Sequence, residues 1–181
     1  MKKQEKSSAT EHMERDYAER VNLVESVKLS NDLKHAIERE ELQMYYQPMI
    51  DFKTGEVEGF EALIRWIHPE RGFVSPGLFI PIMESSGLIV EATKLALRQS
   101  CRSLKRFEDE LSPAVPMKMS VNFSNQDFYS KGFVKNLTKT IAKEGVKPEA
   151  VKIEITERIL MDDPEHTRKV LSECREKGLS V

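Results

Sequence analysis

The sequence predicts an α/β fold that starts with an antiparallel hairpin and continues into a largely parallel sheet. After residue 75, three strand-like runs alternate with longer runs of helical periodicity, which is typical of parallel strands joined by right-handed crossovers. Ahead of them, the strand-like residues 42–50 and 59–66 are separated by the turn-forming residues 51–55, which is typical of a hairpin.

Composition limits the chain to a few broad classes. Its 181 residues are 39% hydrophobic and 32% charged, which is enough for one globular domain with a core. The 28 basic and 30 acidic residues give a net charge of −2, so nucleic acid is not an expected partner. No apolar run approaches the roughly 18 residues that span a membrane, and no apolar segment follows the basic start, so no secretory signal is expected. The expected location is the cytoplasm, including the cytoplasmic part of a membrane-anchored parent.

The first 30 residues are predicted to lie outside the domain. Residues 1 to about 13 are polar and aperiodic, which favours a tail, and residues 14–30 favour a helical linker or an ordinary surface helix. Asn31-Asp32 is predicted to cap a second helix that begins near Leu33. The predicted domain therefore covers residues 31–181.

The segment from Gly59 to Trp66 carries charge where a buried strand should be apolar. Because side chains alternate in an extended chain, Glu61 and Arg65 share one face, whereas Ala62 and Trp66 share the other. Burial of these charges is costly unless they meet a counter-charge, a metal or a ligand. A half-exposed strand with a solvated face is equally consistent with this spacing.

The rest of the chain reads as alternating helices and strands. A loop over residues 67–74 precedes a helix that starts at Ser75-Pro76, is kinked or shortened by Pro81 and ends at Gly87. Cys101 and Cys174 lie in helical patterns, so reduced thiols are expected. The later predicted elements are a helix over 89–107, a strand over 117–123, a helix over 126–144, a strand over 151–156, a helix from Asp163-Pro164 to Gly178, and the start of a strand over 179–181.

Polar side chains occur where three predicted strands end. Glu61, Asn122 and Glu154 occupy such positions, and Glu157 follows shortly after. Catalytic groups of parallel α/β sheets gather at these strand ends. Two carboxylates and an amide oxygen suit Mg²⁺ or Mn²⁺ better than zinc. The alternative is that Asn122 caps the following loop and Glu154 is a solvated strand residue.

Several motifs resemble one known family. The chain contains five motifs in the order found in EAL domains. They are Tyr46-Gln47-Pro48, Glu61-Ala62-Leu63 with the following Ile64-Arg65-Trp66, residues 75–89, residues 120–124 and Glu154-Ile155-Thr156-Glu157. The EAL family comprises bacterial phosphodiesterases that hydrolyse cyclic di-GMP. The resemblance implies a TIM-like (β/α)₈ barrel with a reversed, antiparallel first strand. Because such a barrel needs about 250 residues, residues 31–181 are expected to form the N-terminal portion of a truncated barrel.

The resemblance also implies partners. A partial barrel with open sheet edges is expected to associate with other chains, so a homodimer is one alternative. In a longer parent, a sensory or diguanylate cyclase domain would lie upstream of the helical linker.

The resemblance implies a role for each candidate site residue. Glu61, Asn122 and Glu154 would bind Mg²⁺ or Mn²⁺, and Ca²⁺ inhibits the family. Arg65 would contact phosphate, a task for which Lys is a poor substitute. The implied substrate-binding residues are Gln47, Arg65 and Asn122, and the implied catalytic residues are Glu61, Glu154 and Glu157, the last as a support for a loop near the metals.

The implied reaction is metal-assisted hydrolysis of cyclic di-GMP to the linear dinucleotide. The family's paired Asp motif would begin the strand that starts near Leu179, and the sequence does not contain it. The chain alone is therefore expected to be inactive. The alternative is a non-catalytic module that binds cyclic di-GMP or regulates a protein partner.

Overall fold

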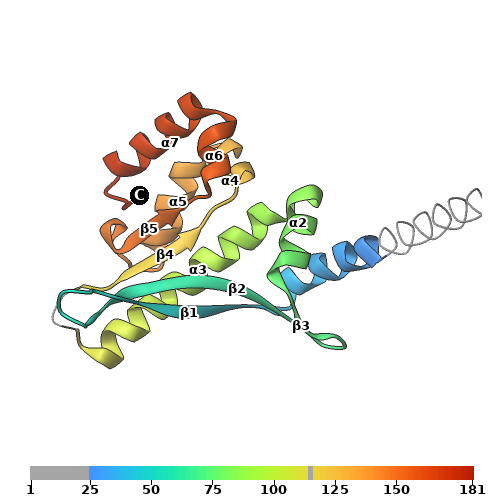
Figure 1. Cartoon of the computed structure of the whole chain (residues 1–181), viewed down its shortest axis with the longest axis horizontal. Coiled ribbons are helices and arrows are strands. Elements are labelled where there is room, and N and C mark those ends of the chain that lie inside the picture. The colour runs from blue at the N-terminus through green and yellow to red at the C-terminus, as the bar shows by residue number, and fades with distance from the viewer. Residues whose placement is uncertain (1–24, 114–115) are drawn as a thin grey trace, which may run out of the picture.

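A curved five-stranded sheet lies at the centre of the computed structural model, which describes residues 25–113 and 116–181 (Figure 1). The strands follow the order β1-β2-β4-β5, and β3 pairs with β2 outside this path. β1 and β2 are antiparallel, whereas β2, β4 and β5 are mutually parallel. The strands are β1 (Leu42–Ile50), β2 (Val57–His68), β3 (Gly72–Val74), β4 (Lys118–Asn122) and β5 (Val151–Glu154).

The predicted hairpin is confirmed, and it is longer than predicted. Residues 51–55 form its turn, in which the Gly55 N–H donates to the Asp51 carbonyl at 2.8 Å. The predicted loop over residues 67–74 is wrong, because β2 continues to His68 and then turns back into β3. Trp66 pairs with Val74 across this second hairpin, and both side chains are buried.

The helices that follow are α2 (Pro76–Ser86) and α3 (Ile89–Leu111), as predicted. Pro76 is the first helical residue, although the Ser75 hydroxyl makes no capping bond. Pro81 lies inside α2 and does not end it. Gly87 ends α2 with a left-handed φ of 74°, which L-residues adopt only with strain.

The single helix predicted over residues 126–144 is wrong. The chain forms α4 (Asn125–Tyr129) and α5 (Phe133–Lys143), because Ser130 is extended and Gly132 takes a left-handed φ of 71° between them. A 3₁₀ turn, η1 (Pro148–Ala150), then leads into β5.

The C-terminal part contains one helix more than the sequence predicted. The short α6 (Glu157–Asp162) precedes α7 (Pro164–Glu176), where the Asp163 side chain accepts the His166 N–H as the predicted cap. Ser180 forms a parallel bridge with Lys152, which agrees with the predicted strand start.

The first described helix, residues 25–38, is continuous. The predicted break at Asn31-Asp32 is therefore wrong, because Leu29, Leu33 and Ala36 recur at helical spacing and are all buried against the sheet. The predicted tail, residues 1 to about 13, and most of the predicted linker lie outside the described residues.

The core occupies the face of the sheet that the helices cover. Ala62, Val121 and Ile153 point to this side and pack with Leu97 of α3 and Leu137 of α5. A second cluster gathers around Trp66, Phe79 and Leu33. The side chains at the alternate positions of β2, β4 and β5, which are mostly polar, lie on the opposite face of the sheet.

No helix in the described part of the chain has both the length and the apolar character needed to cross a bilayer.

We expect Gly59→Ala to destabilise the fold. A Cβ at Gly59 would lie 2.1 Å from the Lys118 carbonyl oxygen, so the β2–β4 pairing must shift. The cost should be about 1–3 kcal/mol of unfolding free energy, measured by urea denaturation. The control is Gly77→Ala in α2, where no atom lies closer than 3.8 Å; this variant should gain about 0.5–1 kcal/mol. Equal stabilities of the two variants would contradict the pairing.

We expect both thiols to resist alkylation in the native protein. Cys101 and Cys174 are free and buried, and burial raises their pKa to about 12 and about 11, respectively. Because the thiolate is the reactive form, iodoacetamide at pH 8 should modify them only at the rate of unfolding. Modification measured by mass spectrometry should therefore accelerate with urea, and fast labelling in buffer would show that the helices do not cover these positions.

Candidate functional site

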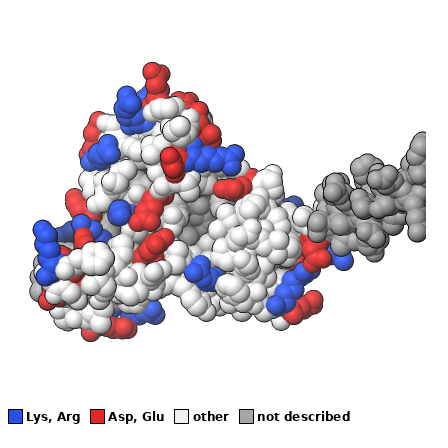
Figure 2. Space-filling model, viewed as in Figure 1, with Lys and Arg blue, Asp and Glu red and all other residues white. Residues whose placement is uncertain are grey.

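Polar side chains line the face of the sheet opposite the packed helices. Strand register places Gln47 beside Glu61, Glu61 beside Ser120, and Asn122 beside Glu154. These side chains share one face because directly paired residues point to the same side of the sheet, and Ser120 and Asn122 lie two residues apart on β4. In the space-filling view, acidic and basic side chains lie close together around the hollow at the centre of the molecule (Figure 2).

Glu61 and Asn122 are in direct contact. The Asn122 Nδ2 donates a hydrogen bond to Glu61 Oε1 at 3.0 Å, from the end of β4 to the middle of β2. Glu61 is half-buried, whereas Asn122 is exposed. The contact shows that the two side chains meet, although they are 61 positions apart. The predicted strand-end position is wrong for Glu61, because β2 continues to His68.

Glu154 has a cationic neighbour on its own strand. Lys152 Nζ lies 3.2 Å from Glu154 Oε1, and both side chains are half-buried. Backbone pairing fixes the position of Glu154, because the Phe123 N–H donates to its carbonyl at 2.9 Å. Lys152 was not singled out as a site residue, although its place two residues before Glu154 puts both on one face.

Arg65 lies near Asn122 at the rim of a pocket. The pocket has a volume of about 280 Å³ and is lined by Arg65, Asn122 and Thr156, among others. The guanidinium donates to the Ile64 carbonyl at 2.9 Å and lies 5.9 Å from the centre of the Tyr45 ring. An arginine at an open pocket beside strand-end polar groups is suited to bind phosphate.

The remaining two candidates lie at the margins. Gln47 is exposed on β1 and faces the same side as Glu61. Glu157 is the exposed first residue of α6. Within the described residues, no hydrogen bond or ion pair joins Glu157 to Glu61, Asn122 or Glu154.

A buried hydrogen-bond network fixes the loop after Asn122. Asp127 accepts from the Ser124 N–H at 2.8 Å, from the Ser124 hydroxyl at 2.7 Å and from the Thr93 hydroxyl at 3.1 Å. Burial raises the pKa of the Asp127 carboxyl, and these hydrogen bonds oppose that rise. The alternative reading of Asn122 as the cap of this loop is wrong, because Ser124 is the N-cap of α4.

The strand-end donors match the chemistry of a hard divalent cation. Two carboxylates and an amide are oxygen donors, which Mg²⁺ and Mn²⁺ prefer, and Mg²⁺ commonly takes only one or two protein carboxylates. In residues 25–113 and 116–181, no group of three His, Cys, Asp or Glu side chains forms a metal cluster.

Comparison with known sequences finds one family. The EAL domain model matches residues 30–181. Over 160 residues the chain is 31% identical to the bifunctional diguanylate cyclase/cyclic di-GMP phosphodiesterase MucR of Pseudomonas aeruginosa, covering 88% of this chain and 23% of MucR. An uncharacterized protein of Synechocystis sp. is 34% identical over 160 residues, covering 87% of this chain and 22% of that protein. The chain thus spans less than a quarter of the length of these curated relatives.

Solved structures agree with the sequence comparison. The PaMucR phosphodiesterase in complex with c-di-GMP has a TM-score of 0.78 at 31% identity, covering 84% of this chain and 61% of that one. The EAL enzyme Bd1971, bound to cAMP and cyclic-di-GMP, has a TM-score of 0.81 at 31% identity, covering 92% and 46%. These neighbours have a TIM-like fold, and the predicted fold class with its antiparallel first strand is confirmed.

We expect Asn122→Asp to make stability depend on divalent cations. The substitution puts a second carboxylate about 3 Å from Glu61, and this repulsion should cost about 1–2 kcal/mol at pH 7 in EDTA. Mg²⁺ should restore most of the loss, measured by urea denaturation. In the control Glu61→Gln/Asn122→Asp, both the loss and the response to Mg²⁺ should be much smaller. A single variant as stable as wild type in EDTA would show that the two side chains do not meet.

Proposed function

Because the chain belongs to the EAL domain family, we propose that it binds cyclic di-GMP at its strand ends and carries ligands for metal-dependent hydrolysis of this nucleotide to the linear dinucleotide. One observation supports this proposal above the others. Glu61, Asn122 and Glu154 lie on three adjacent parallel strands and share one face of the sheet. The active sites of barrels with parallel strands are built at such strand ends.

Three oxygen donors would hold the cation in this proposal. Glu61, Asn122 and Glu154 would bind Mg²⁺ or Mn²⁺, and the bound cation would polarise the phosphate and lower the pKa of a bound water. For this, Asn122 would have to turn its amide oxygen inward, because its nitrogen now faces Glu61. Lys152 would have to release Glu154 or share it with the cation.

The other candidates would position the substrate. Arg65 would neutralise a phosphate, since its guanidinium lines the same pocket as Asn122 and forms no ion pair within the described residues. Gln47 would hydrogen-bond to the nucleotide from β1, on the face that Glu61 shares. Glu157 would support the loop after β5 from the first turn of α6.

One relative supports the choice of ligand by both its name and its solved structure. MucR is named a cyclic di-GMP phosphodiesterase, and its solved phosphodiesterase at 31% identity holds c-di-GMP. MucR also combines cyclase and phosphodiesterase in one protein, which favours an upstream cyclase or sensory domain for this chain as well. With this ligand, the chain would act in cyclic di-GMP signalling in the cytoplasm.

A second candidate is a module that binds cyclic di-GMP, or a protein partner, without hydrolysing it. One observation favours this alternative. Both carboxylates are satisfied without a cation, Glu61 by the Asn122 amide and Glu154 by the Lys152 ammonium. In this case the 181 residues would be inactive alone, and regulation would act through binding or through association as a homodimer.

The binding test is calorimetric titration of cyclic di-GMP in the presence of Ca²⁺. The chain should bind the nucleotide, and Arg65→Ala should bind about tenfold more weakly, as expected for loss of a charge-assisted hydrogen bond. Arg168→Ala on α7, exposed and on another element, is the matched control and should bind like wild type. A folded wild-type sample that does not bind would contradict the phosphodiesterase and the nucleotide-binding module, and would leave only a module that binds a protein partner.

Chromatography of the nucleotide after incubation with Mg²⁺ or Mn²⁺ tests for hydrolysis. Turnover that is lost in Glu61→Ala would support the phosphodiesterase and would contradict the expectation that the chain alone is inactive. Binding without turnover is the result expected of the non-catalytic module and also of a phosphodiesterase domain without the paired Asp motif. Turnover by the purified chain that persists in Glu61→Ala would count against the proposed metal site.

A further inference from the structure

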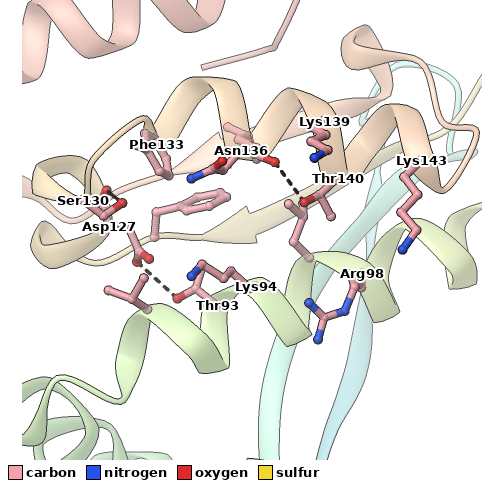
Figure 3. Close-up of a pocket in the computed structure, with 14 residues that line it drawn as sticks. Thr93, Lys94, Arg98, Asp127, Ser130, Phe133, Asn136, Lys139, Thr140 and Lys143 are labelled. Atoms are coloured by element: carbon pink, nitrogen blue, oxygen red, sulfur yellow. Dashed lines mark hydrogen bonds between the residues drawn. The ribbon is translucent and has the colours of Figure 1, made fainter.

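A second pocket lies on the opposite side of the sheet from the strand-end cluster. It has a volume of about 360 Å³ and lies between α3 and α5, beside α4 and the end of β4 (Figure 3). Pockets of this size typically take small molecules, and they combine an apolar lining with a few polar groups. This pocket has that composition. Its apolar lining residues are Val90, Leu97, Phe123, Phe133 and Leu137.

Basic side chains line this pocket from both helices. Lys94 and Arg98 are four residues apart on α3, and Lys139 and Lys143 are four residues apart on α5. Like charges at this spacing repel one another on a helix, as do like charges that face each other across a pocket. The chain as a whole has a net charge of −2, so this concentration of positive charge is local.

Nearby acidic side chains compensate this charge only in part. Glu91 pairs with Lys94 at 2.6 Å. Glu144 pairs with Arg102, which does not line the pocket; this hydrogen bond lowers the Glu144 pKa, and the nearby charges of Lys143 and Arg98 lower it further. Among the described residues, Arg98, Lys139 and Lys143 take part in no ion pair. The one acidic residue that lines the pocket is Asp127, whose carboxylate already accepts three hydrogen bonds.

The pocket is polarised along its length. Arg98 and Lys143 lie at the end opposite Asp127 and Ser130 (Figure 3). Leu137 and Phe133 are buried between these ends. An anionic group at the Arg98–Lys143 end would therefore place an attached apolar body over this lining, away from the carboxylate of Asp127.

We infer that this pocket binds a small amphipathic anion, meaning a carboxylate, sulfonate or phosphate joined to a compact apolar body. The negative group would be held by Arg98 and Lys143, for which a charge-assisted hydrogen bond is the expected contact. The apolar body would pack against Leu97, Phe133 and Leu137. The proposal is independent of the strand-end site, because it uses none of that site's side chains.

The two sites are nevertheless close. Phe123 lines this pocket and directly follows Asn122, whose side chain points to the opposite face of the sheet. Asp127 and Thr93, which fix the loop after Asn122, line the same pocket. A ligand here would therefore contact the back of the strand end that carries Asn122.

The test uses anilinonaphthalene sulfonate as a fluorescent amphipathic anion and the whole chain as the receptor. We expect saturable binding to one site, displaced by octanoate and not by octanol, because octanol has the same apolar body without the charge. The variant Arg98→Gln/Lys143→Gln should bind the probe about tenfold more weakly, since a charge-assisted contact is lost. The matched control Lys169→Gln/Lys177→Gln removes two exposed charges from the region of α7 and should bind like wild type.

Four results would overturn the proposal. The first is equal affinity of both double variants, with circular dichroism showing that both are folded. The second is displacement by octanol as strong as by octanoate, which would show that charge is irrelevant. The third is displacement by inorganic phosphate as strong as by octanoate, which would leave an anion site without an apolar component. The fourth is competitive displacement by cyclic di-GMP, which would place the probe in the strand-end site.

Discussion

The parallel pairing of β2, β4 and β5 is the constraint on which both proposed sites depend. Because side chains alternate along each strand and the strands pair in register, one face of the sheet collects Ala62, Val121 and Ile153, and the other collects Glu61 and Asn122. A slip of one residue in any strand would exchange these faces. Gly59 permits this pairing, since a side chain there would overlap the backbone of β4.

The polar face is stable because its charges neutralise or hydrogen-bond one another. The Asn122 amide contacts Glu61, and Lys152 contacts Glu154, so neither carboxylate is left alone on a half-buried surface. In the proposed function, a divalent cation would have to displace these two contacts. The two candidate functions would therefore differ in whether a metal can displace contacts that the protein already makes.

The opposite side of the same strand end has the reverse character. There the apolar core opens into a pocket whose rim carries Arg98, Lys139 and Lys143. Phe123 and the Asp127 network form the wall between the two sites. One short segment of chain after β4 thus links a polar site on one face with a cationic, partly apolar site on the other.

The sequence by itself determined the fold class, the hairpin, the family and the polar residues that end β4 and β5, because these follow from local alternation, turn residues and short motifs. It predicted neither the β3 hairpin nor the break at Gly132, where one backbone conformation interrupts a continuous helical pattern. Only the tertiary structure decided that the Asn122 amide meets Glu61, and that cations of α3 and α5 face one pocket. Such contacts join residues tens of positions apart, and strand register and helix packing, rather than local pattern, bring them together.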